Sequence, residues 1–292
     1  MPDYIVPNNT ETMPVKDFLR RQAGLSLTLW RKVKHSGTVL LNGQPTHPHA
    51  LAYPGSIITV TWPEETSMSP EPLPLTVLFE DDYIIVIDKP AGMLVHPAST
   101  QSTGTLANAV IYYYQSKGYT FGFHPVNRLD RNTSGLVLIA KRPDIQHWFN
   151  QHNDKIMKTY IAVAAGIPDP LQGTIDAPIG RKSGSIVERE VQPSGQHAIT
   201  HYKVLGTLND ASLLEVSLVT GRTHQIRVHL SFINCPLLGD DLYGGSKDLI
   251  DRQALHAAKL SLLHPVTKTT IEINSPLPAD MDLLIHKLGF CS

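Results

Sequence analysis

The chain has 292 residues, of which 41% are hydrophobic and 17% are charged, and this length predicts one large domain or two smaller ones. Its formal net charge of -1 is not typical of a nucleic-acid-binding protein, unless the basic residues are grouped along the chain. It has no apolar run long enough to span a bilayer, no secretory signal and only two cysteines. These features favour a soluble, cytoplasmic protein without disulfides.

The first 62 residues predict a flexible end followed by a small folded unit. Residues 1–12 are polar and have no period, so we expect a flexible N-terminus. Apolar residues recur at helical spacing from Val15, and Gly24 ends this first helix; a second helix is predicted from Leu27 or Thr28 to Ser36. Asn42-Gly43 after an apolar run predicts a hairpin, so residues 13–62 form a helix–hairpin unit.

Basic residues gather on these two helices. They are Lys16, Arg20, Arg21, Arg31, Lys32 and Lys34. Two helices with basic faces followed by the phrase V-L-L-N-G resemble the alpha-L RNA-binding domain. This resemblance implies that the six side chains grip RNA phosphates without reading sequence. The alternative is that they only keep the two helices solvated.

A proline-rich linker over residues 63–75 separates this unit from a larger domain, residues 76–292. Four prolines interrupt the linker, which is expected to be extended and semi-rigid. Strands are predicted over 76–80, 84–88, 136–140, 159–164, 198–205, 212–219, 257–263 and 269–273. Helices are predicted over 105–117, 143–152, 223–232 and 279–288. Strands dominate without regular strand–helix alternation, which favours the α+β class.

The most informative motif is R-L-D-R-N-T-S-G-L, residues 128–136, which places Asp130 between Arg128 and Arg131. A carboxylate between two guanidinium groups is expected to stay ionised, which suits a nucleophile or an electrostatic stabiliser better than a proton donor. The alternative is a charged turn with a surface ion pair that contributes little.

A second motif, G-R-T-H-Q-I-R-V-H-L, covers residues 221–230. Thr223 can cap a helix that carries Arg227 in its early part. Two histidines, His224 and His229, raise the question of a metal site. Their spacing is wrong for adjacent helical ligands and no cysteine cluster accompanies them, so we expect no metal.

Both motifs resemble those of the RluA-type pseudouridine synthases, which isomerise uridine within RNA. The likeness extends from about residue 77 to 275, with Lys158-Thr159-Tyr160 matching the K-x-Y phrase of the family. It implies a central, mostly antiparallel sheet with flanking helices and an RNA-binding cleft. Where the family pattern has a histidine before the motif arginine, this chain has Asn127, which puts in doubt a histidine near the target nucleotide.

The resemblance also implies roles for individual residues. Asp130 is the catalytic carboxylate, Tyr160 stacks on the uracil and takes part in the final proton removal, and Arg222 pairs with Asp130. Arg128 helps to flip the base out of its stack. The remaining RNA-binding candidates are Arg131, Thr133 and Arg227, the last of which contacts a phosphate or braces the site.

No cofactor is expected, because the reaction moves no net electrons. The expected partner is RNA, most often large-subunit ribosomal RNA in family members with the N-terminal domain, with transfer RNA as the alternative. A non-catalytic RNA-binding assembly factor is the competing class of protein. We expect a monomer with no membrane partner.

Overall fold

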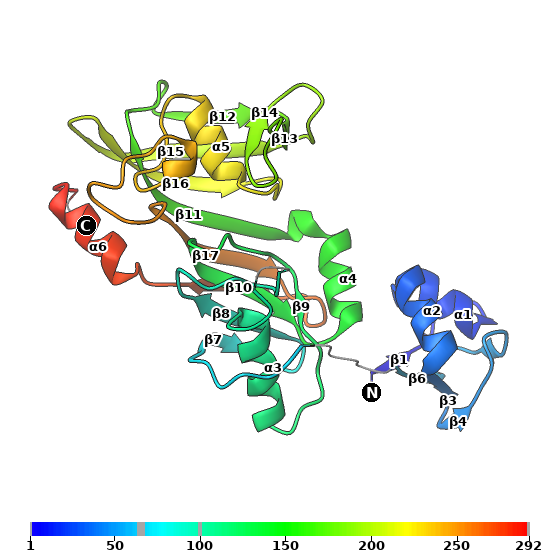
Figure 1. The fold of residues 1–292 in the computed structure, drawn as a ribbon. Helices are drawn as coiled ribbons and strands as arrows, with labels where there is room; N and C mark the ends of the chain where they lie inside the picture. The colour runs from blue at the N-terminus through cyan, green and yellow to red at the C-terminus, as the bar shows by residue number, and fades with distance from the viewer. Residues whose placement is uncertain (1, 63–67, 99–100, 291–292) are drawn as a thin grey trace.

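The computed structural model describes residues 2–62, 68–98 and 101–290, and two parts of it are built around separate sheets (Figure 1). The N-terminal part has a four-stranded sheet in the order β1-β6-β3-β4, with two helices packed on it and a short β2–β5 pair. Its elements are β1 Asp3–Ile5, β2 Met13–Pro14, α1 Val15–Arg21, α2 Leu27–Ser36, β3 Thr38–Leu41, β4 Gln44–Pro45, β5 Leu51–Ala52 and β6 Ile57–Thr61.

The two helices and the hairpin of this part follow from local sequence. Ser26 caps α2 by accepting a hydrogen bond from the Leu29 backbone N–H at 3.0 Å. Asn42 and Gly43 both have positive φ, 50° and 80°, and they join β3 to β4. A two-residue turn of this kind matches the twist of the flanking strands.

The expectation of a flexible N-terminus over residues 1–12 was wrong for part of that range. β1 pairs with β6 from Asp3 opposite Thr59 to Ile5 opposite Ile57, and the Val6 side chain is fully buried. Met1 lies outside the described residues. A three-residue strand is too short to show a period of two, so the sequence pattern could not reveal it.

The second part holds a ten-stranded sheet in the order β12-β15-β16-β11-β17-β10-β8-β7, with β18 beside β17 and β9 beside β10. Every pairing in it is antiparallel except β10 with β17. The strands are β7 Thr76–Glu80, β8 Ile84–Lys89, β9 His124–Pro125, β10 Ser134–Ala140, β11 Ile156–Ala165, β12 Gln172–Asp176, β15 Ile199–Leu208, β16 Ala211–Leu218, β17 Leu255–Leu263 and β18 Thr270–Asn274. The predicted α+β class with a mostly antiparallel central sheet is therefore confirmed.

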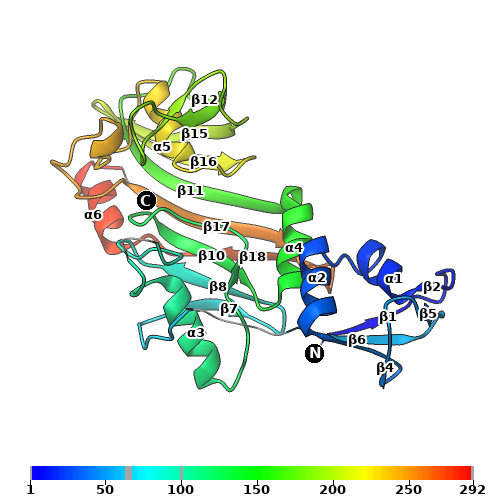
Figure 2. The ribbon, with the colours of Figure 1, turned by 45° about the vertical axis from the view of Figure 1, so that its right-hand side comes forward.

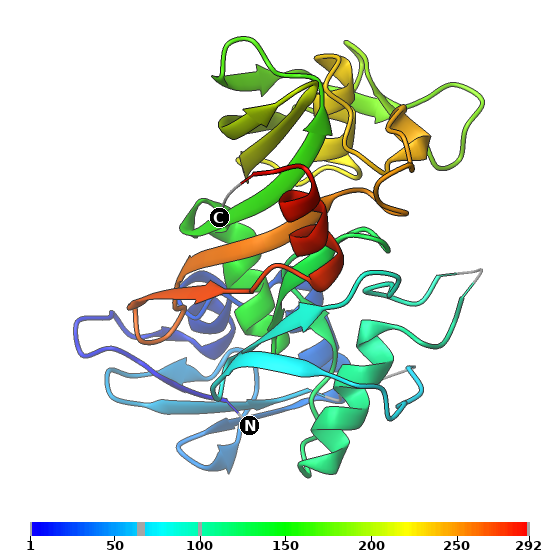
Figure 3. The same ribbon diagram turned by 90° about the vertical axis from the view of Figure 1, so that its left-hand side faces the viewer.

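Helices cover both faces of this sheet (Figure 3). They are α3 Leu106–Ser116, α4 Pro143–Gln151, α5 Gln225–Phe232 and α6 Ala279–Lys287, with 3-10 turns at Asn153–Lys155 and Asp241–Tyr243. Every residue of β10 is buried, because Val137 and Ile139 face the core that includes α3 while Leu136 and Leu138 face the core that includes α4. This explains why β10 reads as a continuous apolar run.

The sequence missed four short strands of this part. They are β9, β12 and the pair β13 Ile179–Arg181 and β14 Arg189–Val191, which form a hairpin of their own. β12 lies at the edge of the large sheet and is partly exposed, so it lacks a strong apolar pattern.

The predicted linker has two portions. Residues 63–67 lie outside the described residues, whereas residues 68–75 have no regular secondary structure. Hydrogen bonds join this second portion to the start of α3. Asn108 Nδ2 donates to the Ser69 carbonyl at 2.7 Å, and the Glu71 carboxylate accepts from the Gly104 N–H at 2.8 Å.

The N-terminal part contacts the larger one at α4. The Tyr4 hydroxyl donates to Asp144 Oδ2 at 2.9 Å, and Figure 2 shows the N-terminal part on the α4 side of the larger part. Asp144 is in turn held by the Arg142 side chain, with Nε at 3.0 Å from Oδ1.

Candidate active site

Asp130 lies in the loop that precedes β10, above the point where β10 and β17 run parallel. The Thr133 N–H closes this loop on the Asp130 carbonyl at 3.1 Å. Gly135 has a φ of 109°, and a Cβ there would lie 2.3 Å from the Ala257 carbonyl oxygen. Only glycine allows so close an approach, so Gly135 fixes the loop against β17.

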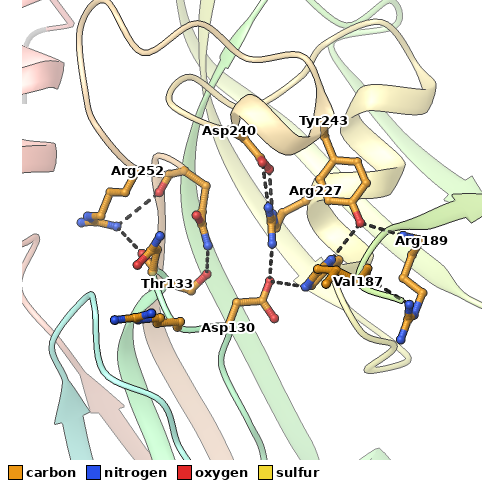
Figure 4. Close-up of polar contacts among 12 residues, drawn as sticks. Asp130, Thr133, Val187, Arg189, Arg227, Asp240, Tyr243 and Arg252 are labelled. Carbon is orange, nitrogen blue, oxygen red and sulfur yellow. Dashed lines mark hydrogen bonds and ion pairs between the residues drawn. The ribbon is translucent and has the colours of Figure 1, made fainter. Parts of the chain in front are cut away.

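Arg227, in the first turn of α5, holds the Asp130 carboxylate. Its Nη1 lies 3.1 Å from Asp130 Oδ2, while Nε lies 2.7 Å from Asp240 Oδ2 and Nη2 lies 2.7 Å from Asp240 Oδ1. Figure 4 shows the Arg227 guanidinium between Asp240 and Asp130. Arg227 is buried, which acts to lower its pKa, but the hydrogen bonds and charges of the two carboxylates raise that pKa above its usual value. The guanidinium is therefore a fixed cation beside Asp130.

The expected pairing of Arg222 with Asp130 was wrong, as was the cap by Thr223. Arg222 is exposed, and its Nε donates to the His197 carbonyl at 2.9 Å. The helix begins only at Gln225, whose side-chain oxygen accepts the Arg222 backbone N–H at 2.9 Å. Arg222 thus precedes the helix, whereas Arg227 falls on the turn that faces Asp130.

Two roles were expected for Arg227, and its contacts in the structure are of the kind that a brace would make. Each of its three guanidinium nitrogens contacts a carboxylate oxygen, so the side chain bridges Asp130 and Asp240. The side chain is buried, as is that of Asp240. A buried carboxylate needs such a charged partner.

Tyr160 reaches the same site from β11. A register shift between Thr159 and Tyr160 places Tyr160 opposite Ala257, the residue of β17 that Gly135 contacts from the other side. The Tyr160 side chain is buried, and burial followed by the nearby charge of Asp130 raises the pKa of its hydroxyl well above the usual range. The hydroxyl therefore stays protonated and is a hydrogen-bond donor at neutral pH.

These residues surround one cavity of about 380 Å³. It brings together six of the residues predicted for the site: Arg128, Asp130, Thr133, Tyr160, Arg222 and Arg227. Arg131 does not line it; its Nε donates to the Gly92 carbonyl at 3.0 Å. Thr133 is almost completely buried, and its hydroxyl accepts from Gln253 at 3.2 Å.

Two further side chains, which the sequence left without a role, hold the Asp130 loop from beneath. The buried Lys89 ammonium donates to the carbonyls of Pro90, Met93 and Arg131 at 2.8, 2.9 and 3.1 Å. Burial lowers the pKa of Lys89 to about 7, against the opposing influence of Asp130. Arg252 joins the Asn132 carbonyl, at 3.1 Å from Nη1, to Asp280 in α6, at 2.6 Å from Nε.

Asn127, which replaces the histidine of the family pattern, binds the backbone of β10. Its Nδ2 donates to the Leu136 carbonyl at 3.1 Å and its Oδ1 accepts the Leu138 N–H at 2.8 Å. The amide therefore extends the pairing that β9 makes with β10, and it helps to aim the following Arg128.

Most of the basic residues of the N-terminal helices are open to solvent. Lys16, Arg21, Arg31, Lys32 and Lys34 are exposed. Arg20 is half-buried, and its Nη1 donates to the Leu25 carbonyl at 2.7 Å, so it also serves the fold of the helix pair. Lys32 lies near His124 of the larger part. Burial is the main cause that lowers the pKa of His124 to about 4, and the positive charge of Lys32 lowers it further.

Within residues 2–62, 68–98 and 101–290, no three metal-ligating side chains gather into a possible metal site. His224 binds Tyr243 and His229 binds Thr200, so both motif histidines have protein partners. No helix in these ranges is both long enough and apolar enough to cross a membrane.

Comparison with known proteins identifies the family of this chain. The family model described as RNA pseudouridylate synthase matches residues 83–232. An uncharacterized RNA pseudouridine synthase of Bacillus subtilis, YjbO, is 40% identical over 279 residues, which cover 94% of this chain and 98% of that protein. Ribosomal large subunit pseudouridine synthase D of Zymomonas mobilis is 38% identical over 79% of this chain and 78% of its own length.

A solved structure supports the same conclusion. Human RNA pseudouridylate synthase domain containing 4 superposes with a TM-score of 0.60 at 26% identity, covering 73% of this chain and 93% of that one. The likeness in sequence extends through both motifs that form the cavity. The chain therefore belongs to the RluA-type RNA pseudouridylate synthase family, and it is an isomerase that converts uridine to pseudouridine in RNA.

Proposed function

We propose that this isomerase modifies uridines of large-subunit ribosomal RNA, with Asp130 as its catalytic carboxylate. The observation that carries the catalytic assignment is the Asp130–Arg227 pair, which presents a braced carboxylate in a cavity of about 380 Å³. The proposed substrate is supported by relatives named ribosomal large subunit pseudouridine synthase D in Zymomonas mobilis, Pasteurella multocida and Xanthomonas campestris.

The geometry suits the bond changes of the reaction. The bond from the ribose anomeric carbon to the ring nitrogen N1 breaks, the uracil turns, and a bond from the same carbon to ring carbon C5 forms. The hydrogen on C5 is then lost, and N1 gains a proton. An ionised Asp130 can attack the anomeric carbon or the ring, or remove a ribose proton on a glycal route, and all three routes need its carboxylate unprotonated.

Arg128 is proposed to help expose the target base. Its side chain is exposed, yet it lines the cavity that holds Asp130. A stacked base cannot turn within a helix, so the nucleotide must leave the stack before reaction. The planar guanidinium of an arginine can take the place of that base by stacking or hydrogen bonding.

The N-terminal part is proposed to add RNA affinity without adding chemistry. Its exposed basic residues lie outside the cavity and can neutralise phosphates over a wider surface. We also propose that the protein acts in the cytoplasm. We propose that it acts as a monomer, since one chain supplies Asp130, Tyr160 and Arg227 to one cavity.

Tritium release provides the test, because the C5 hydrogen leaves the uracil in each turnover. Purified protein is incubated with transcripts of large-subunit ribosomal RNA or of transfer RNA that carry 5-tritiated uridine. We expect release from the ribosomal transcript, and none with Asp130→Asn. Release from transfer RNA alone would replace the proposed substrate, and release by Asp130→Asn at the wild-type rate would remove Asp130 from its role.

A further inference from the structure

The backbone of His224 adopts a left-handed conformation immediately before α5. Its φ is 57° and its ψ is 21°, and its side chain makes no capping hydrogen bond to the helix. Such a conformation is uncommon for residues other than glycine, asparagine, aspartate and histidine, and functional sites often contain it. The interactions of the imidazole ring therefore need an explanation beyond helix capping.

One of those interactions determines where the ring carries its proton. His224 Nδ1 lies 2.8 Å from the Tyr243 hydroxyl oxygen, which also accepts the Arg189 backbone N–H at 3.0 Å. Because the backbone N–H can only donate, it occupies an acceptor position of the hydroxyl oxygen and favours donation of the hydroxyl proton to Nδ1. An imidazole that accepts at Nδ1 carries its hydrogen on Nε2. Figure 4 shows the Tyr243 hydroxyl and its bond to Arg189.

The other ring nitrogen points into the cavity. His224 Nε2 lies 3.9 Å from Asp130 Oδ2, the same oxygen that Arg227 contacts. Burial lowers the pKa of His224, while the charge of Asp130 raises it and that of Arg227 lowers it further. The net direction keeps the imidazole neutral, with an N–H group toward the carboxylate.

Tyr243 supports both groups that face Asp130 Oδ2. Its hydroxyl binds His224, and its ring lies under the Arg227 guanidinium, with 4.9 Å between Cζ and the ring centroid. Tyr243 is far from Asp130 along the chain and lies in the 3-10 turn Asp241–Tyr243 that follows α5. One aromatic side chain thus fixes both the position of the Arg227 guanidinium and the orientation of the His224 imidazole.

We propose that His224 is a positioning residue for Asp130, in which a neutral imidazole held by Tyr243 directs its Nε2–H at Oδ2. With Arg227 on the same oxygen, Asp130 Oδ1 becomes the oxygen presented to the nucleotide. The contact of 3.9 Å shortens to a hydrogen bond when the nucleotide displaces water from the cavity. This inference rests on the proposed catalytic role of Asp130.

The first test measures the tautomer of His224 and needs no RNA. In the full-length protein labelled with nitrogen-15 on its histidines, NMR correlations between ring nitrogens and ring protons report which nitrogen is protonated. We expect the His224 hydrogen on Nε2 at neutral pH, and a loss of this preference in Tyr243→Phe. A wild-type ring that is protonated on Nδ1, or on both nitrogens, would overturn the inference.

The second test compares single-turnover rates and RNA affinity. Asparagine tolerates the left-handed backbone at position 224 but is too short to reach Asp130. His224→Asn therefore removes the imidazole while it preserves the backbone conformation. We expect its rate at saturating RNA to fall by about 10- to 100-fold, with unchanged RNA affinity and unfolding temperature. Tyr243→Phe should slow the reaction less, because its ring remains under Arg227.

His286→Asn, the same exchange at an exposed position on α6, serves as the matched control and should behave as wild type. A His224→Asn variant that reacts at the wild-type rate would show that the imidazole does not position Asp130. If instead wild-type protein releases no tritium from any RNA, the proposed function fails, while the NMR result on the tautomer can still be read.

Discussion

The Arg227 guanidinium joins Asp130, at 3.1 Å from Nη1, to the buried Asp240, at 2.7 Å from both Nε and Nη2. One cation is thus shared by a carboxylate that faces a cavity and a carboxylate that does not. Asp240 contributes no group to the cavity, but it fixes the plane in which Arg227 meets Asp130. Loss of Arg227 should therefore lower stability because Asp240 loses its partner, and lower activity because Asp130 loses its partner.

Arg227→Met should lower both turnover and stability. We expect the free energy of unfolding to fall by about 3–5 kcal/mol, because Asp240 is left as an unpaired buried charge. Adding Asp240→Asn should recover much of that stability but not the turnover, since Asp130 still lacks its brace. Urea denaturation and single-turnover kinetics on the two variants would check this.

Arg222→Met is the matched control for that pair, because Arg222 is exposed and bonded to a carbonyl. Its unfolding free energy should change by no more than about 0.5 kcal/mol. If Arg222→Met instead destabilised the protein as much as Arg227→Met, the distinction between the two arginines would fail.

Tyr160→Phe should bind RNA as the wild type does and form product more slowly. The ring remains available for stacking on a base, which contributes about 1–3 kcal/mol, and only the hydroxyl is lost. Because burial and Asp130 raise the pKa of Tyr160, its hydroxyl acts as a donor, and the wild-type rate should show no rise between about pH 7 and 9 from phenol ionisation.

Tyr160→Leu, which removes the ring, should weaken RNA binding as well as turnover. Binding and single-turnover rates measured in parallel separate the two effects. Wild-type behaviour in both variants would make Tyr160 a residue of the core and not of the site.

Glutamine at the five exposed basic positions of the N-terminal helices should weaken RNA binding and reduce its salt dependence. The positions are Lys16, Arg21, Arg31, Lys32 and Lys34; Arg20 is kept because it supports the fold. Each lost phosphate contact should reduce the slope of log affinity against log salt by about 0.7–0.9. Turnover at saturating RNA should survive, and an unchanged slope would show that these helices do not grip RNA.

The stability of the protein should depend on pH through His124. Its folded pKa of about 4 lies below the ordinary value of 6.5, so the unfolded state takes up a proton first as the pH falls. The contribution is complete above pH 6.5 and is lost progressively toward pH 4, up to a total of about 3 kcal/mol.

Two variants check this dependence by urea denaturation at several pH values. His124→Gln should flatten the change in unfolding free energy between these limits. Lys32→Gln should raise the pKa of His124 by removing a nearby positive charge, which NMR titration can follow. A His124 pKa that does not respond to Lys32→Gln would separate the N-terminal helices from this histidine.

Long apolar patterns made the larger part of the fold predictable. β10 has seven buried residues in succession, and α3 begins at a capping box formed by Thr105 and Asn108. Local sequence is therefore enough to predict both elements. β1 escaped prediction because its three residues gain their order from pairing with β6, a contact across more than fifty residues.

The site was predictable in its residue types but not in every pairing. The second motif holds two arginines, and which of them meets Asp130 depends on where α5 begins. Gln225 sets that start by accepting the Thr220 hydroxyl and the Arg222 N–H on its side-chain oxygen. Tyr243 and Asp240 lie outside both motifs, and their contacts with Arg227 follow from tertiary packing.

The contact that Arg252 makes with both Asn132 and Asp280 bears on the synthesis of the protein. The ribosome produces the Asp130 loop about 150 residues before α6, and a nascent chain therefore carries the motif while Arg252 still lacks its carboxylate partner. The loop gains its full set of bonds only after α6 has emerged and docked. In a nascent chain, the Asp130 loop therefore lacks the support that Arg252 and Asp280 give it until the C-terminal helix has been made.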